Sequence, residues 1–305
     1  PTLSLEKVNF TCQDLGAQSV RLFARDGYDN ETSCIAQVVV RDTTPPIVRC
    51  QPGIAYLDAL GGIQVDPQQL DNGSADLCGG RLTFHVEPVS FGCNTLGTRP
   101  ITLFTTDQFG NIASCQTTVS VLDTVAPEAV CLDQTIFLDA AGLATLSVAA
   151  VDRSTDNCVV EQSTLEQTVF SCTDLGRKQV LLSIEDFSGN QDTCYAAVVV
   201  HDTIAPEAKC SDATLYLDEN GQAELNASDL NVGSTDNCGV PNRFALSKSQ
   251  FSCSDTGVKP VELTVFDAPG NTNQCTAQVT VRDTIAPTPL CTDTTVYLDV
   301  NGQAQ

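Results

Sequence analysis

The residues best suited to chemistry in this sequence are its fifteen cysteines. They recur at nearly constant offsets with a period of about 80 residues, which indicates tandem repeats. There is no Cys-x-x-Cys pair and there are only two histidines, His85 and His201, so a zinc site is not expected. A catalytic thiol needs an activating neighbour, and neither histidine recurs beside a cysteine. The cysteines therefore predict structural disulfides made in an oxidising compartment, although four cysteines per repeat leave three pairings open.

Aspartate and asparagine form a second recurring pattern. An aspartate opens each phrase of the form Asp-Thr-x-x-Pro, and a turn of the form Asp-x-x-Gly-Asn follows late in each complete repeat. Carboxylate and amide oxygens are the ligands that Ca²⁺ prefers, so we expect a calcium site where phrase and turn meet at a repeat end. The candidate ligands are Asp42, Asp107, Asn111, Asp123, Asp186, Asn190, Asp202, Asp267, Asn271 and Asp283, with Asp26 and Asn30 in the first partial repeat.

Two aspartates in the string Ser-Thr-Asp-Asn, Asp156 and Asp236, are further candidate ligands. The competing interpretation is that all these residues only make turns, because Asp and Asn side chains in turns mostly bond to their own backbone.

The elements that must position these residues are short strands. In residues 202–282, alternation of apolar and polar residues predicts strands at 213–218, 261–267 and 275–283. Asn220-Gly221 predicts a hairpin turn that returns the chain along 223–230, and residues 268–271 predict another. The last strand places Cys275, Ala277, Val279 and Val281 on one apolar face. Since helical periodicity is absent, six or seven strands per repeat predict an all-β fold of immunoglobulin-like β-sandwiches.

The repeat phrase sets the expected domain boundaries. They are 1–41 (the C-terminal part of a repeat), 42–122, 123–201, 202–282 and 283–305 (the N-terminal strands of a further repeat). A unit of about 80 residues buries too little surface to be very stable without disulfides. Proline in each phrase fixes φ and restricts the preceding residue, so we expect stiff junctions and a linear array.

Charge and composition exclude several functions. The net charge of −23 argues against nucleic acid and anionic membranes as partners. No apolar run is long enough to cross a membrane. The chain begins inside a repeat without a signal segment, so we expect a mature product or part of a longer polypeptide. The absence of Gly-x-Ser-x-Gly, His-Glu-x-x-His and phosphate-loop motifs predicts that it is not an enzyme.

Four strings resemble the HYR-type immunoglobulin-like repeats of large bacterial surface and secreted proteins, which are common in Bacteroidota. They are GSTDNCGV (233–240), FSCSDTG (251–257), FDAPGN (266–271) and CTAQVTVRDTIAP (275–287). The likeness covers the whole chain and implies adhesive or spacer modules outside the cell, without catalysis. The repeat 42–122 departs from it with NGSADLCGG (72–80), which predicts a weaker version of that loop.

We favour a pairing of the first cysteine of each repeat with the fourth, and of the second with the third. The resemblance implies the first set, Cys50–Cys115, Cys131–Cys194 and Cys210–Cys275; the second set is Cys78–Cys93, Cys158–Cys172 and Cys238–Cys253. Each closed loop would add about 3–4 kcal/mol.

Possible glycosylation sites lie beside each junction. The Asp-Thr-x phrase resembles the O-glycosylation signal of Bacteroidota, which implies sugar on Thr43, Thr124, Thr203, Thr284 and Thr294. Asn-x-Ser/Thr strings add Asn9, Asn30, Asn72 and Asn226. A glycan coat would solubilise and shield the array. Alternatively, the threonines simply end strands and the strings arise by chance.

The two partial repeats predict self-association. Together they lack only the counterpart of residues 225–241 of a complete repeat. We expect the strands of 283–305 to fill the open edge of 1–41 in a neighbouring chain and so build a head-to-tail filament. Cys291 would then bond Cys34 of the neighbour, leaving Cys12 without its usual partner. The rival is a polypeptide that simply continues.

These features predict a secreted structural protein that forms a rigid filament or stalk, with itself as main partner and calcium as the possible cofactor. The alternative is an adhesin that binds glycans or other surfaces. Aromatic residues make up only 6% of the chain and no repeat has an irregular insertion, which favours the structural function.

Overall fold

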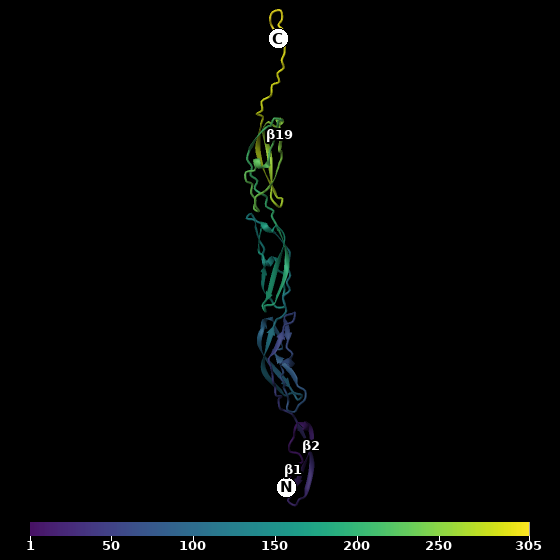
Figure 1. The fold of residues 1–305 in the computed structure, drawn as a ribbon. Helices are drawn as coiled ribbons and strands as arrows, with labels where there is room; N and C mark the ends of the chain where they lie inside the picture. Colours follow the sequence, from purple (N-terminus) through teal and green to yellow (C-terminus); the bar gives the residue numbers. More distant parts are fainter. Residues whose placement is uncertain (305) are drawn as a thin grey trace. The chain divides into compact units, whose positions relative to one another are not determined.

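The computed structural model describes residues 1–304, and these are all-β apart from single helical turns (Figure 1). The α-helices are α1 (Val148–Val151) and α2 (Ala227–Leu230), and short 3₁₀ helices lie at η1 (Cys12–Asp14), η2 (Pro67–Leu70), η3 (Cys93–Thr95), η4 (Cys172–Asp174) and η5 (Cys253–Asp255). No helix in the described part is long and apolar enough to cross a membrane. By internal contacts the chain divides into two compact units. Residues 1–132, 151–166 and 181–195 form the first, and the rest of the described chain forms the second.

The first unit opens with a three-stranded antiparallel sheet of order β1-β2-β3. Its strands are β1 (Thr2–Leu5), β2 (Gly16–Arg25) and β3 (Glu31–Val40). Val20 is buried here, whereas Leu3, Ile35 and Val39 are largely exposed. This sheet therefore leaves much of its apolar surface uncovered.

The same unit contains a β-sandwich from residues 42–122. Its strands are β4 (Gly53–Tyr56), β5 (Gly62–Gln64), β6 (Thr83–Glu87), β7 (Ser90–Gly92), β8 (Gly97–Thr106) and β9 (Ile112–Leu122). A four-stranded sheet of order β4-β9-β8-β6 faces the two-stranded sheet β5-β7. β4 runs parallel to β9, with Gly53 opposite Val119, while the other pairs are antiparallel. Leu70, Val86 and Leu103 are fully buried in the core between the sheets.

The second unit contains the equivalent sandwich from residues 202–282. Its strands are β16 (Ala213–Tyr216), β17 (Gln222–Glu224), β18 (Arg243–Leu246), β19 (Gln250–Ser252), β20 (Gly257–Phe266) and β21 (Thr272–Arg282). The sheets are β16-β21-β20-β18 and β17-β19, and β16 again runs parallel to the last strand, β21. Leu225, Leu230 and Leu263 are buried in its core.

Residues 123–201 repeat this topology, and their strands are shared between the two units. The strands are β10 (Gln134–Phe137), β11 (Leu143–Thr145), β12 (Val160–Leu165), β13 (Val169–Ser171), β14 (Gly176–Asp186) and β15 (Gln191–His201). The sheet order β10-β15-β14-β12 with β11-β13 matches the other two repeats. Each sheet thus takes its strands from one expected repeat, while the boundaries themselves stay a prediction.

The expected hairpin of the last two strands is confirmed. β20 and β21 pair antiparallel across residues 267–271, and Ala277, Val279 and Val281 are buried with Cys275 packed against the same core. The all-β sandwich fold predicted from the sequence is therefore correct.

The hairpin expected at Asn220-Gly221 is wrong. β16 and β17 belong to different sheets, because β16 pairs with β21 whereas β17 pairs with β19. The Asp218 carboxylate accepts hydrogen bonds from the backbone N–H groups of Asn220 and Gln222, which makes a turn that carries the chain from one sheet to the other. The expected return strand also ends early: β17 is followed by α2, and this helical turn lets Leu230 join Leu225 in the core.

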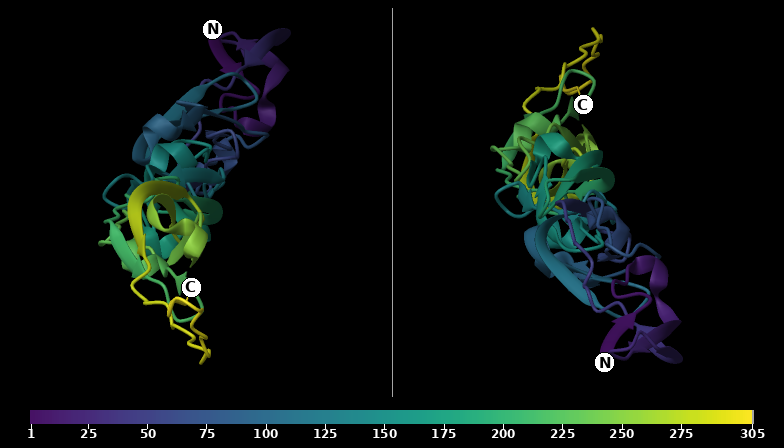
Figure 2. Two further views of the ribbon diagram at one scale, coloured as in Figure 1. Left: turned by 90° about the horizontal axis from the view of Figure 1, so that it is seen from above. Right: turned by 90° about the horizontal axis from the view of Figure 1, so that it is seen from below.

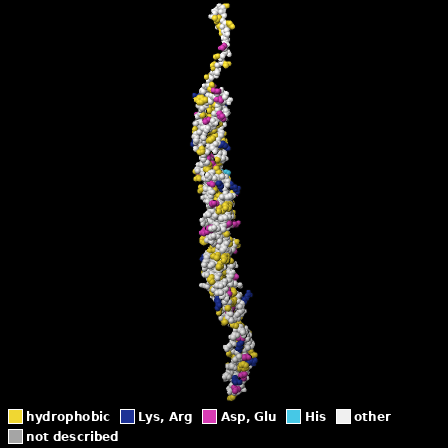
Figure 3. All heavy atoms as spheres, in the orientation of Figure 1, with side chains coloured by type: hydrophobic (Ala, Val, Ile, Leu, Met, Phe, Trp, Pro, Cys, Tyr) yellow, Lys and Arg dark blue, Asp and Glu magenta, His cyan; other side chains and the backbone are white. Residues whose placement is uncertain are grey.

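Residues 283–304 contain no strand in the described chain. They extend from the last sandwich as irregular backbone, drawn in yellow in Figures 1 and 2. Val296, Tyr297 and Leu298 are exposed along this segment. Figure 3 shows hydrophobic side chains along it, and mixed hydrophobic and acidic side chains on the visible face of the sandwiches. The segment thus carries strand-forming residues without a partner strand in this chain.

Candidate functional site at the junctions between repeats

The disulfides within repeats match the expectation. Cys50–Cys115, Cys131–Cys194 and Cys210–Cys275 each join the segment before the first strand to the last strand. Cys50 and Cys115 pack against one core, and Cys210 and Cys275 against another. These bonds close each sandwich on itself.

The expected second-to-third pairing, Cys78–Cys93, Cys158–Cys172 and Cys238–Cys253, is wrong. The third cysteine of each repeat instead bonds the second cysteine of the next, giving Cys12–Cys78, Cys93–Cys158 and Cys172–Cys238. The physical reason is that the two cysteines of one repeat lie in different places. Cys238 lies beside the linker aspartate Asp202, whereas Cys253 lies beside the Gly221 turn. Successive repeats are therefore covalently linked at a second point besides the chain itself.

The expectation that Cys12 lacks a partner is also wrong, since Cys12 bonds Cys78. Three cysteines of the described chain are free and exposed: Cys34, Cys253 and Cys291. The expected bond between Cys34 and Cys291 of two chains is not tested by a single chain.

An asparagine side chain bridges two of the junctions. The amide Nδ2 of Asn157 donates to the Asp58 carbonyl of the preceding repeat at 3.0 Å and to Asp123 Oδ1 at 3.1 Å. Asn237 Nδ2 donates in the same way to the Asp139 carbonyl and to Asp202 Oδ1, both at 3.2 Å. Each bridge ties a turn of one repeat to the loop and the linker of the next.

The corresponding position in repeat 42–122 is Leu77, which is 77% exposed. A leucine cannot donate the amide hydrogen bonds, so the departure noted in the sequence removes this bridge at the first junction.

Glycine allows the close approach at the same two junctions. Gly61 and Gly142 have φ of 73° and 72°, a conformation that favours glycine. A Cβ on Gly142 would lie 2.7 Å from Cys172 Sγ and 2.8 Å from the Asn237 carbonyl oxygen, and a Cβ on Gly61 would lie 2.5 Å from the Asn157 carbonyl oxygen. The turn of one repeat therefore packs directly on the cysteine loop of the next.

The Asp-x-x-Gly-Asn turns hold the linker by hydrogen bonds. The Asp107 carboxylate accepts from the N–H groups of Phe109 and Asn111 and from Asn111 Nδ2, so both its oxygens are used. Burial raises the pKa of Asp107, but the hydrogen bonds from Asn111 and Phe109 outweigh it and leave the pKa below the ordinary value. Asn111 Nδ2 also donates to the Asp42 carbonyl.

The equivalent turns repeat this arrangement. Asn190 and Asn271 donate to the carbonyls of Asp123 and Asp202, and their partners Asp186 and Asp267 accept from them. In the first partial repeat, Asp26 and Asn30 make the same turn on an exposed surface. Asp283 lies in the exposed tail and accepts from the Ile285 N–H. For the turn residues, these contacts favour the turn-making interpretation.

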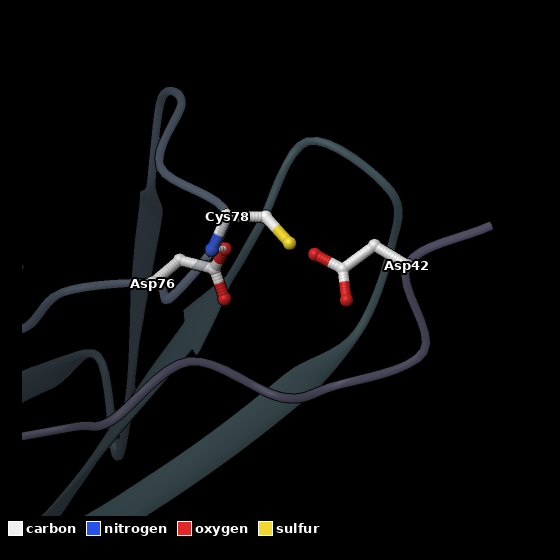
Figure 4. Close-up of side chains that lie close together, drawn as sticks. All are labelled: Asp42, Asp76 and Cys78. Atoms are coloured by element: carbon white, nitrogen blue, oxygen red, sulfur yellow. Dashed lines mark hydrogen bonds between the residues drawn. The ribbon is translucent and has the colours of Figure 1, made fainter. Parts of the chain in front are cut away.

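The linker aspartates meet a different set of carboxylates. Asp42 lies near Asp76, Asp123 near Asp156, and Asp202 near Asp236, with the closest candidate ligand atoms within 4.8 Å of one another in each group. Figure 4 shows Asp42 and Asp76 beside Cys78 at the first junction. The cysteine of each group is disulfide-bonded, so its sulfur is not a thiolate ligand. Of the expected calcium ligands, the fold therefore joins Asp123 with Asp156 and Asp202 with Asp236, whereas Asp42 meets Asp76, which was not among the expected ligands.

Within the described residues, none of these carboxylates forms a salt bridge. Asp123 and Asp202 are 7% and 5% exposed. Burial, and then the charges of Asp202 and Asp267, raise the pKa of Asp236 above its ordinary value. The sequence pattern could mark each aspartate but not these pairs, because their approach depends on the loop folding back to the linker.

The expected glycosylation residues are all accessible. The structure exposes the threonines Thr43, Thr124, Thr203, Thr284 and Thr294 and the asparagines Asn9, Asn30, Asn72 and Asn226. Thr124 and Thr203 are exposed although each follows a buried aspartate.

Together, the fold and the junctions define a protein of tandem β-sandwich repeats that are linked to one another by disulfides. Residues 201–281 match the family model of the HYR domain, which supports an HYR-type immunoglobulin-like repeat in this part of the chain. No curated protein matches the chain.

The solved structures that match this chain include extracellular cadherin domains. The protocadherin gammaB4 extracellular domain is 14% identical over 92% of this chain and 59% of that chain, with a TM-score of 0.32. Drosophila N-cadherin EC1-4 is 12% identical over 92% of each chain, with a TM-score of 0.32. Protocadherin gamma C5 EC1-3 is 16% identical over 76% of this chain and 100% of that chain, with a TM-score of 0.38.

Proposed function

We propose that the chain is a structural extracellular protein whose repeats are linked into a mechanically resistant scaffold. The observation that carries this proposal is the bond from each third cysteine to the next repeat, seen in Cys12–Cys78, Cys93–Cys158 and Cys172–Cys238. A second covalent link restricts bending and twisting at a junction that already has little slack. Disulfides persist outside the reducing cytosol, which supports secretion, and the bacterial source implied by the resemblance is part of the proposal.

The scaffold function is tested by single-molecule stretching of the chain under oxidising conditions and after substitution of Cys172 and Cys238 by serine. We expect the junction of the double variant to extend at lower force than the unchanged junctions, because the linker is then the one covalent link between the repeats. Equal extension of both proteins would contradict a mechanical role for this bond.

The proposal includes head-to-tail assembly of copies. In the complete repeats the last strand pairs on one side with a parallel first strand, for example β21 with β16, where Val279 lies opposite Ala213. β3 is the equivalent last strand, and it pairs only with β2 in the described chain. Its exposed Ile35 and Val39 lie on this uncovered sheet.

Residues 283–304 carry the matching first strand. Val296 and Tyr297 occupy the positions that correspond to Leu215 and Tyr216 of β16, and both are exposed. The next turn is already formed, since Asp299 accepts from the N–H groups of Asn301 and Gln303 as Asp218 does in its repeat. We propose that this strand of one copy adds in parallel to β3 of another, with Thr294 opposite Val38.

This register would place Cys291 opposite Cys34, as Cys210 lies opposite Cys275 in a complete repeat. With oxidised glutathione as the oxidant, the two thiols would lose two protons and two electrons to form one disulfide, and two molecules of glutathione would be released. Both thiols are exposed, so the reaction is sterically open.

Assembly is tested on the full chain by sedimentation and by non-reducing electrophoresis. We expect multimers joined by disulfides, which Cys34→Ser and Cys291→Ser abolish. Cys253→Ser is the matched control, because Cys253 is also a free exposed thiol but has no place in this register. A chain that stays monomeric at high concentration, or a ladder lost only in Cys253→Ser, would contradict the proposal.

A second pair of variants separates strand addition from disulfide formation. Val296→Asp places a charge in the proposed strand, whereas Val300→Asp changes a fully exposed turn residue outside it. We expect Val296→Asp to weaken reversible association and Val300→Asp to leave it unchanged.

We further propose that glycans on the exposed linker threonines Thr43, Thr124, Thr203 and Thr284 coat the scaffold. Mass spectrometry of the protein isolated from its native source tests this: intact linker peptides without added mass would contradict it.

A further inference from the structure

Three junctions contain the same pair of neighbouring carboxylates. In each, the aspartate that opens the linker meets the aspartate that lies two residues before the second cysteine, with ligand atoms within 4.8 Å of one another. The pairs are Asp42 with Asp76, Asp123 with Asp156, and Asp202 with Asp236. Two like charges at this distance repel strongly when they are shielded from water.

In the pair Asp202 and Asp236, one oxygen of each carboxylate lacks a hydrogen-bond partner within the described residues. Asp202 Oδ1 accepts from the Ile204 N–H and from Asn237 Nδ2, and Asp236 Oδ2 accepts from the Cys238 N–H. The other oxygens, Asp202 Oδ2 and Asp236 Oδ1, are buried and have no hydrogen-bond partner within the described residues. Because Asp202 is only 5% exposed, its charged oxygen cannot be solvated by bulk water.

Carboxylate oxygens without a hydrogen-bond partner also occur at the other junctions. Among the described residues, Asp42 Oδ2, Asp76 Oδ2 and Asp156 Oδ1 are also buried without a partner. The amide oxygens of Asn157 and Asn237 are buried without a donor as well, because these side chains use their nitrogen in the bridge. Buried acceptors of this kind need an ordered water, a proton or a cation as partner.

The chemistry of the donors selects the cation. The unpartnered atoms are carboxylate and amide oxygens, which suit a hard cation, and the sulfur in each group is held in a disulfide. Ca²⁺ takes about six to eight oxygen ligands in a flexible geometry, whereas Mg²⁺ needs a near-ideal octahedron and usually keeps several of its waters, so this set of protein oxygens favours Ca²⁺. A small cavity of about 60 Å³ beside Asp236 and Asp267 leaves room for water ligands at one junction.

We propose that each junction binds one calcium ion through its linker aspartate and its loop aspartate, with the neighbouring asparagine oxygen as a further ligand where it is present. This site differs from the one expected from the sequence. The Asp-x-x-Gly-Asn turns donate hydrogen bonds to the linker, whereas the oxygens without a partner belong to the linker and loop residues. The ion would fix the linker to the disulfide-bonded loop, and the inference does not depend on assembly between copies.

Calorimetric titration of the full, oxidised chain with CaCl₂ after chelator treatment tests the proposal. We expect about three ions per chain, with Kd near the 10⁻⁴–10⁻³ M range of extracellular modules, and a melting temperature that rises with calcium concentration. MgCl₂ at the same concentration should give a much smaller shift.

Single-site variants identify the ligands. Asp236→Asn should remove one ion from the stoichiometry or weaken one site at least tenfold, and it should not destabilise the calcium-free protein, because it removes half of a repelling pair. Asp218→Asn is the matched control, since Asp218 also accepts backbone hydrogen bonds but belongs to an exposed turn. Circular dichroism and disulfide mapping would verify folding of each variant.

Two results would overturn the proposal. One is the absence of saturable binding up to 10 mM CaCl₂, which would mean that a proton or ordered water satisfies the pair. The other is binding that Asp236→Asn leaves intact and Asp218→Asn reduces, which would mean that the ion is held by surface charge.

Discussion

At the residue scale, Asn237 joins two repeats with a single amide group. Its Nδ2 contacts a carbonyl of the preceding repeat and the carboxylate of its own linker, so one side chain fixes the turn, the loop and the linker together. Such a residue contributes more than an ordinary loop asparagine, because its loss leaves a buried carboxylate with one donor fewer.

We therefore expect Asn237→Ala to destabilise the chain by about 1–2 kcal/mol, measured by chemical unfolding. Leu77→Ala is the matched control at the equivalent position, where the exposed leucine makes no bridge, and we expect almost no change. Equal losses in both variants would show that the amide bonds contribute little.

Gly142 tests the close approach of the repeats. Gly142→Ala combines a positive φ with a Cβ in contact with Cys172 and Asn237, whereas Gly189→Ala has a φ of 85° and its nearest atom, on the flexible Glu185 side chain, is 4.0 Å away. We expect about 1 kcal/mol of strain in Gly189→Ala and a larger loss in Gly142→Ala. Only the latter should lower the yield of the Cys172–Cys238 bond, as judged by thiol labelling. Equal labelling of the two variants would contradict the packing argument.

The sequence identified the acidic residues but not their roles. Asp107 opens an Asp-x-x-Gly-Asn turn and Asp202 opens a linker phrase, and both were expected calcium ligands, yet the first is satisfied by its own turn and the second faces another carboxylate. The difference depends on residues 34 positions away in the chain, and local patterns carry no information on such contacts.

At the element scale, the disulfides within repeats and the disulfides between repeats have different structural roles. The bond Cys210–Cys275 joins the segment before β16 to β21 and packs against the core, whereas Cys172–Cys238 lies between repeats. The first stabilises a sandwich, and the second positions one sandwich against the next.

Replacing Cys210 and Cys275 with alanine should therefore lower the stability of repeat 202–282 by about 4 kcal/mol, the value for a loop of this length. Replacing Cys172 and Cys238 should leave core amides protected in hydrogen exchange and increase exchange mainly in the junction turns and loops. If the second variant also exposes the core strands, the two classes are not separable.

Strand type was easier to predict than strand pairing. Alternation located β20 and β21 and their buried face, because a hairpin is a local structure. It failed for β16 and β17, where the same turn residues lead from one sheet to the other, because β16 pairs with the distant strand β21 and β17 pairs with β19. The prediction of the cysteine pairing failed for a related reason. Pairing the second and third cysteines within each repeat leaves Cys12 unpaired, and pairing them between repeats leaves Cys253 unpaired. The number of cysteines is therefore compatible with both schemes.

At the scale of the whole molecule, the many aspartates make stability depend on pH. Backbone and side-chain hydrogen bonds lower the pKa of Asp58, Asp174 and Asp218, and the bond from Lys7 lowers that of Asp14. A carboxylate with a lowered pKa stabilises the fold at pH values above its unfolded pKa of about 3.9 and loses this effect as the pH falls through its folded pKa.

We thus expect the urea midpoint to change little between pH 7 and pH 5 and to fall steeply below about pH 4. The raised pKa of Asp236 has the opposite effect, because protonation of this carboxyl at low pH stabilises the folded state. More carboxylates have lowered pKa values than raised ones, so their effect dominates. A midpoint that stays constant from pH 5 to pH 2.5 would contradict this assignment.

The central claim is that disulfides link successive repeats, and peptide mapping without reduction tests it most directly. Proteolysis of the oxidised chain followed by mass spectrometry should yield linked peptides that contain Cys93 with Cys158 and Cys172 with Cys238. Linked peptides that contain Cys78 with Cys93, or Cys158 with Cys172, would contradict the account.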